Sequence, residues 1–141
     1  MDGFSREPNE VTLGRSIVLT LRGHQPVGGG SSARWDWRRA IADRARAARA
    51  EHALGEVPVS SIFEVDVVFF LSPARARAVD VDNLVRPVLN TLFDSRDEQA
   101  DRTLTATLFD AEDARIHRLL VEKRTVDDPA QEGIEVVVRW S

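Results

Sequence analysis

The sequence predicts an α+β fold, a two-layer sandwich in which a mixed β-sheet carries two helices. Segments with the composition of strands are interleaved with segments whose apolar residues recur at helical spacing, in the order strand, helix, strand, helix, strand, strand. Of the 141 residues 43% are hydrophobic, which is enough for one core. We therefore expect a single domain over residues 15–141, preceded by a flexible N-terminal arm, residues 1–14.

Four segments have the composition of strands. Residues 16–22 and 61–71 are rich in β-branched and apolar residues, and residues 114–126 and 133–140 supply the last two strands. Residues 23–32 contain a proline and three consecutive glycines, so we expect a flexible loop there. This loop lacks the Gly-Lys-Ser/Thr ending of a phosphate-binding P-loop.

Two helices are predicted from the spacing of apolar residues. The first covers residues 33–54, with Ser32 as its N-cap and Gly55 as its stop. Its apolar stripe consists of Trp37, Ile41, Ala45 and Ala48. The second covers residues 82–93, and Pro87 inside it predicts a kink or a late helix start.

Two further segments lack such periodicity. Residues 73–78 are expected to form a short basic loop, and residues 94–110 a partly ordered insertion. The chain has no cysteine, which excludes a disulfide framework, a cysteine-ligated zinc site and a thiol nucleophile. No apolar run approaches the ~18–20 residues that a membrane span needs. We expect a cytoplasmic protein that does not interact with a membrane.

The charge distribution is polarised although the net charge is only −4. Residues 31–54 contain six arginines and three acidic residues, whereas residues 94–113 contain seven acidic residues and two arginines. Such a surface can bind an anion at one place while the whole molecule stays acidic. The arginines of the first helix are candidates to follow a DNA backbone; the alternatives are a solvated face and pairing with the acidic segment. Trp35, off the apolar stripe, could stack on an unpaired base if it is exposed; partial burial and a dimer contact are the alternatives.

The densest group of chemically active residues is Asp80-Val-Asp82-Asn83-Leu84-Val-Arg86. Two carboxylates two residues apart in an extended segment point the same way, and a divalent cation prefers such oxygen ligands. Arg86 follows Asp82 by one helical turn and could hold a phosphate or the carboxylate itself. The alternative is an ordinary helix N-cap with a turn, because the same residue types favour both.

A second acidic group, Glu112-Asp113, precedes the third predicted strand. By itself it is typical of a solvated turn. Together with Asp80 and Asp82 it could complete a carboxylate cluster for metal-assisted phosphodiester cleavage.

These motifs resemble the RusA-type Holliday junction resolvase family. The similarity covers residues 73–124 and consists of Asp80-x-Asp82-Asn83-Leu84-x-Arg86, Glu112-Asp113-Ala-x-Ile and Glu122-Lys123. It implies a Mg²⁺-dependent endonuclease, with Mn²⁺ as a substitute, that works as a homodimer. Such an enzyme cuts four-way DNA junctions symmetrically in recombination and repair.

The resemblance also implies roles for individual residues. Asp80, Asp82 and Asp113 fall on the metal-binding acids, Glu112 on the first acid of the acidic pair, and Arg86 on a catalytically important lysine. The basic residues that we expect at the DNA are Arg34, Arg38, Arg75, Arg77, Arg86 and Lys123.

The chain departs from the family pattern at several positions. Arg86 replaces the lysine, Glu112 replaces an aspartate, and Asn90 stands where an aspartate is common. Asp82 and Asp113 are 31 positions apart, a longer spacing than we expect of the family. Asn90, the insertion and the acidic pI of about 5.4 favour an alternative, a non-catalytic nucleic-acid or protein-binding module on the same fold. Convergence of the three aspartates would distinguish the nuclease from the binding module.

Overall fold

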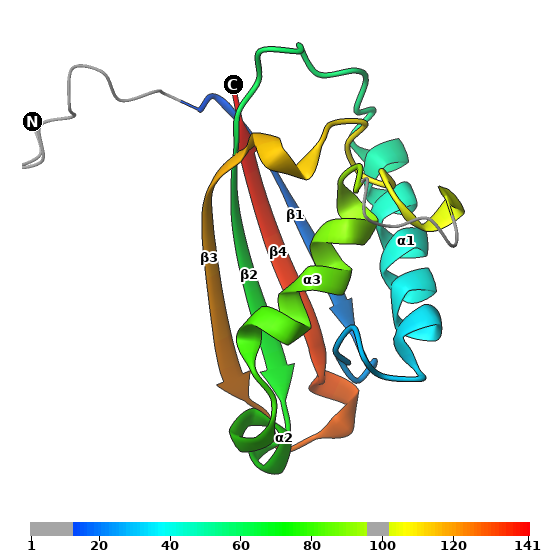
Figure 1. The fold of residues 1–141 in the computed structure, drawn as a ribbon, viewed down its shortest axis with the longest axis vertical. Coiled ribbons are helices and arrows are strands. Elements are labelled where there is room, and N and C mark those ends of the chain that lie inside the picture. Colours follow the sequence, from blue (N-terminus) through cyan, green and yellow to red (C-terminus); the bar gives the residue numbers. More distant parts are fainter. Residues whose placement is uncertain (1–12, 96–101) are drawn as a thin grey trace, which may run out of the picture.

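The computed structural model describes residues 13–95 and 102–141, and it confirms the predicted α+β class. The sheet is mixed and has the strand order β1-β4-β2-β3 (Figure 1). β4 pairs antiparallel with both β1 and β2, and β3 pairs parallel with β2. The strands are β1 (Arg15–Arg22), β2 (Phe63–Leu71), β3 (Ile116–Thr125) and β4 (Gly133–Trp140).

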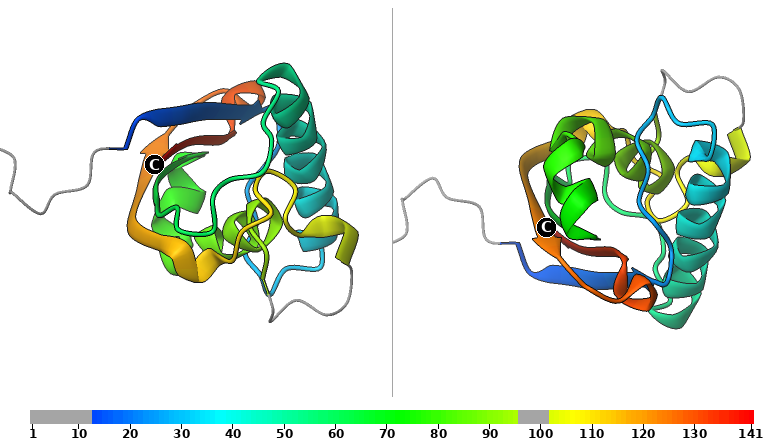
Figure 2. Two further views of the ribbon diagram at one scale, coloured as in Figure 1. Left: turned by 90° about the horizontal axis from the view of Figure 1, so that it is seen from above. Right: turned by 90° about the horizontal axis from the view of Figure 1, so that it is seen from below.

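Both long helices lie on the same side of this sheet (Figure 2). α3 (Val81–Leu92) crosses the sheet and contacts β3, and α1 (Arg34–Glu51) packs between α3 and β1. The shorter helical elements are α2 (Pro73–Ala78), η1 (Arg102–Leu104), η2 (Asp113–Arg115) and η3 (Pro129–Gln131). In the described part of the chain, no helix is long and apolar enough to cross a membrane.

The core lies between the sheet and the two helices. The predicted apolar stripe of α1 is confirmed, because all four of its residues are buried. At one end of the sheet, Phe63, Phe93, Phe109 and Trp140 pack together with ring centroids 4.9 to 5.4 Å apart. This aromatic cluster joins β2 and β4 to the chain that follows α3.

The ends of α1 differ from the prediction. Ala33 rather than Ser32 is the N-cap residue, and Ser31 Oγ accepts a hydrogen bond from the Ala33 backbone N–H at 3.1 Å. The helix ends at Glu51, before the predicted stop at Gly55, because the chain turns at Ala53 with φ of 49°. Local hydrogen bonds therefore ended this helix without the glycine that usually adopts such a conformation.

Residues 73–78 form helix α2 instead of the predicted loop. Ser72 is its N-cap and accepts a hydrogen bond from the Arg75 backbone N–H at 3.3 Å, and Pro73 occupies the first helical position. Serine before proline is a helix-start signal, and the sequence analysis overlooked it. Pro87 does not delay α3, which begins at Val81 and continues through the proline.

Part of the predicted insertion, residues 94–110, belongs to the core. Leu104, Leu108 and Phe109 are buried, and the backbone N–H groups of residues 106–109 bond to carbonyl oxygens of residues 91–93. These hydrogen bonds satisfy the last carbonyls of α3, which a helix leaves without partners of its own. Residues 96–101 of the predicted insertion, and residues 1–12 of the predicted N-terminal arm, lie outside the described residues.

Candidate active site

The two aspartates of the motif lie at the start of α3. Asp80 is the N-cap residue, with an extended backbone, and Asp82 is the second residue of the helix. The Asp80 side chain makes no capping hydrogen bond, whereas Asp82 Oδ1 accepts one from the Asn83 backbone N–H at 3.0 Å. Both residues are exposed. The N-cap position of the alternative is thus confirmed for Asp80. Its carboxylate makes no capping hydrogen bond and can accept an external ligand.

A small cavity brings Arg86 and Asp113 together. It has a volume of about 170 Å³ and lies between α3 and the start of β3. Its lining residues are Val85, Arg86, Leu89, Asn90, Asp113 and Leu119. Asp113, which the motif assigns to the metal site, and Arg86, which it assigns to the phosphate, therefore line the same cavity.

A larger cavity of about 290 Å³ lies on the other side of Arg86, between α3 and the start of α1. Its lining residues are Gly29, Arg34, Arg38, Asn83, Arg86, Pro87 and Asn90. Three of these side chains are guanidinium groups, two are amides, and none is acidic. A wall of this chemistry suits a phosphate, which guanidinium groups bind through two parallel hydrogen bonds.

The loop before α1 approaches Asn83 closely. A Cβ atom built on Gly28 would lie 2.1 Å from Asn83 Nδ2, so a side chain at position 28 would displace the Asn83 side chain. The motif residues by themselves do not predict a contact with this loop. The triple glycine before an arginine-rich helix was the signal that could have led to it, because a loop without side chains can pack closely against a functional residue.

The expected convergence of three aspartates is not found. Among the described residues, no group of three or more metal-ligating side chains is close enough to hold an ion. Helix α3 separates the acids. Asp80 precedes it, whereas the Asp113 backbone N–H donates to the Asp94 carbonyl at 3.2 Å, just beyond the other end.

The donor chemistry at the start of α3 nevertheless fits magnesium. Mg²⁺ keeps several water ligands and is usually held by one or two carboxylates together with substrate phosphates, rather than by an all-protein cage. Asp80 and Asp82 could supply those carboxylates. Their negative charges offset the positive end of the helix dipole, which by itself would disfavour a cation at this place. The residues fit a two-carboxylate site and do not form a three-aspartate one.

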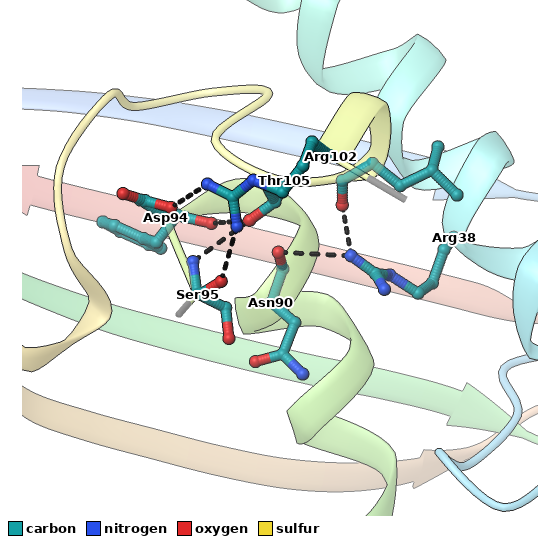
Figure 3. A network of polar contacts seen from close by, with 8 residues as sticks. Arg38, Asn90, Asp94, Ser95, Arg102 and Thr105 are labelled. Carbon is teal, nitrogen blue, oxygen red and sulfur yellow. Dashed lines mark hydrogen bonds and ion pairs between the residues drawn. The ribbon is translucent and has the colours of Figure 1, made fainter. Parts of the chain in front are cut away.

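Arg38 is not on a DNA-facing surface, contrary to the prediction. Its side chain is 2% exposed and joins α1 to α3 and η1 (Figure 3). Arg38 Nε donates to Thr91 Oγ1 at 2.8 Å, and Nη2 donates to the Asn90 carbonyl at 3.3 Å and to the Leu104 carbonyl. The buried face of α1 is therefore wider than its apolar stripe and includes a charged residue with internal acceptors.

Lys123 also makes internal contacts. Its ammonium group donates to the carbonyls of Ala76 and Val79 at 2.6 and 2.9 Å, and so holds the end of α2 against β3. Of the other basic residues expected at the DNA, Arg77 is exposed and Arg75 half-buried on α2. That Lys123 contacts DNA stays a prediction.

Trp35 is half-buried, and neighbouring arginines cover it. The Arg34 guanidinium lies 4.8 Å from the ring centroid and that of Arg38 lies 5.5 Å away. The Arg34 Nη1 group also donates to the Ser31 carbonyl at 3.2 Å. Stacking of a base on Trp35 would compete with these cation–π contacts.

In the described part of residues 94–113, one ion pair lies within the segment itself. Arg102 binds Asp94 at 2.8 Å, within the segment that follows α3 (Figure 3). On α1 itself, exposed ion pairs join residues of the same helix, such as Arg39 and Asp36 at 2.6 Å. Surface pairs of this kind contribute little to stability.

The chain matches no protein-family model and no curated protein. The similarity to RusA-type resolvases therefore rests on the motif residues alone.

Proposed function

We propose that this protein is a Mg²⁺-dependent, structure-selective endodeoxyribonuclease that resolves four-way DNA junctions as a cytoplasmic homodimer, with Mn²⁺ able to substitute. The observation that carries the proposal is the position of Arg86. It lines both cavities along α3, one turn after Asp82 and across from Asp113. A phosphodiester held by Arg86 would lie next to the Asp113 carboxylate on one side and next to guanidinium and amide groups on the other.

Arg86 would hold the scissile phosphate. A guanidinium group is planar and presents its donors in a fixed fork, so it binds two phosphate oxygens at once and stays charged at any working pH. This geometry also explains why arginine can replace lysine here for binding. It does not replace lysine as a proton donor, because a guanidinium group does not release its proton.

The neighbouring residues would position the DNA backbone. Arg34 and Asn83, from α1 and the first turn of α3, line the larger cavity and could bind the adjacent phosphate. Asp80 and Asp82 would hold the ion. When bound, Mg²⁺ would supply Lewis-acid polarisation of the phosphoryl oxygen and a water of lowered pKa. Asp113 would orient Arg86 across the small cavity rather than join the other two aspartates.

Cleavage of a labelled four-way junction tests the proposal. The wild-type protein with Mg²⁺ should nick two opposing strands symmetrically, and Asp82→Asn should abolish nicking while junction binding persists, because the basic residues are unchanged. Asp43→Asn is a matched control: it removes an exposed carboxylate from α1 whose nearest basic partner is 3.9 Å away. Cleavage that persists in Asp82→Asn, or is lost equally in Asp43→Asn, would contradict the assigned role of Asp82.

A second function, a non-catalytic nucleic-acid-binding module, is favoured by one observation. Within residues 13–95 and 102–141 the acids do not form a group of three, while Arg34 and Arg86, besides the buried Arg38, line the larger cavity. Binding of branched DNA that depends on Arg34 and Arg86, without cleavage in Mg²⁺ or Mn²⁺, would support this second function over the first.

A further inference from the structure

The free edge of β3 is the least protected apolar surface of the described structure. β3 is the last strand in the order β1-β4-β2-β3, with β2 on one side and no described strand on the other (Figure 1). Two of the four large hydrophobic residues that are exposed lie here, Leu119 at 41% and Leu120 at 49%. An exposed strand edge of this kind presents unpaired backbone groups that can pair with another strand.

The parallel pairing with β2 decides which way each β3 side chain points. Leu119 and Val121 are in register with the buried Val65 and Val67, so they face the helices. Arg118, Leu120 and Glu122 alternate with them and face the opposite side of the sheet.

The residues on that opposite side are self-complementary. If two copies of β3 pair antiparallel about a two-fold axis at Leu120, each Arg118 lies directly opposite Glu122 of the other copy, and the two Leu120 side chains meet on the axis. On the helix side, the same register places Leu119 opposite Val121. The Arg118 and Glu122 side chains are 65% and 44% exposed and can therefore reach a partner.

The internal contacts of these charged residues are compatible with such pairing. Arg118 lies 4.0 Å from Glu64 on the same face. Glu122 accepts a hydrogen bond from exposed Arg124, and this bond, together with the negative charge, raises the pKa of Arg124. Lys123 does not place a charge at the edge, because α2 carbonyls bind its ammonium group. The other edge strand, β1, has no acidic residue and is not complementary to itself in charge.

We infer that a second copy of this chain docks on β3, in an antiparallel register centred on Leu120, and that the two sheets become one continuous eight-stranded sheet. Because the two-fold axis of such a pair is perpendicular to the sheet, both copies of α3 lie on the same face. Leu119 lines the small cavity beside Arg86. The inferred interface therefore places two candidate sites on one face near the axis. It rests on the proposed homodimer and does not require nuclease activity.

The test is sedimentation of the full chain, without DNA or added metal, over a range of protein concentrations. The wild type should form a dimer. Arg118→Glu and Glu122→Arg each replace two opposite-charge contacts with two like-charge contacts, and each should raise the dimer dissociation constant at least about tenfold. The double variant R118E/E122R should return to about the wild-type value.

The double variant separates the interface from effects within one copy. In the double variant, the glutamate at position 118 lies beside Glu64 of its own copy, so that contact stays repulsive. Between the copies, position 118 again faces an opposite charge at position 122, so the contact across the interface is restored. Arg15→Glu, the same charge change on β1, is the matched control and should remain dimeric. Thermal unfolding checks that each variant folds. A monomeric wild type, an unchanged dissociation constant in either single variant, or a double variant that stays monomeric would overturn the inference. Because the assay contains no DNA, a loss of nuclease activity alone would leave the interface standing.

Discussion

Replacement of Arg38 by methionine tests whether the buried guanidinium joins α1 to the rest of the fold. Methionine keeps much of the aliphatic stem and removes the charged group. At least three acceptors among the described residues lose their donor: Thr91 Oγ1 and the carbonyls of Asn90 and Leu104. Each lost hydrogen bond costs about 1 kcal/mol, so we expect Arg38→Met to lower the free energy of unfolding by about 3 kcal/mol.

Urea denaturation followed by tryptophan fluorescence measures this loss. With a urea m-value of about 2 kcal/mol/M, the midpoint should fall by about 1.5 M. Arg39→Met is the matched control, because Arg39 is the next residue of α1, is 58% exposed and pairs only with an exposed aspartate. It should change stability by less than about 0.5 kcal/mol.

Double-mutant coupling adds a second measurement. Thr91 Oγ1 accepts from Arg38 and donates to the Pro87 carbonyl at 2.7 Å, so Thr91→Val removes one partner of the same network. The combined loss should be smaller than the sum of the single losses by about 1 kcal/mol. If Arg38→Met matches Arg39→Met in stability, or the two losses simply add, the structural role assigned to Arg38 is wrong.

Two glycine replacements test close backbone approaches. In Gly133→Ala, the new Cβ would lie 1.9 Å from a carbonyl oxygen of β1, at a φ of 152°. The free energy of unfolding, measured by thermal denaturation, should fall by at least about 2 kcal/mol. Gly55→Ala is the control, because the space around that position is open, and it should leave the free energy of unfolding nearly unchanged. If both variants lose the same amount of stability, the effect of Gly133→Ala does not come from the predicted clash. Gly28→Ala should displace Asn83 and weaken junction binding about tenfold, or about 1.4 kcal/mol, in a titration where Gly30→Ala binds normally. Normal binding by Gly28→Ala would contradict a role for Asn83.

Local patterns were sufficient to predict the main elements. The stripe of α1 and the alternation in β4 follow from side-chain periodicities of 3.6 and 2, which depend on neighbouring residues alone. The predicted strand 133–140 therefore coincides with β4, and Asp82 lies at the start of a helix as predicted. The prediction that Asp80 and Asp82 share an extended segment was wrong, because Asp82 is already helical and α2, not a strand, precedes the motif. Local signals were also present for α2, whose Ser72 and Pro73 form a helix start that the sequence analysis did not use.

Other features depend on residues that are distant in the sequence. Arginine is usually exposed, so the burial of Arg38 follows only from acceptors that α3 and η1 supply more than 50 residues later. The separation of Asp113 from Asp80 likewise follows from the direction of α3 and from the hydrogen bond between residues 113 and 94. The exposure of the β3 edge depends on the strand order, which no single segment specifies.

The sequence by itself thus determined the α+β class, the order of the elements and the chemical types gathered in the motif, because these depend on local periodicity and residue chemistry. Only the tertiary structure decided which groups meet. Arg86 lines two cavities, Arg38 is buried, and among the described residues the three aspartates do not form one metal-binding group. The physical reason is that contacts between distant segments arise when helices and strands bury their apolar faces together, and that packing is a property of the whole chain.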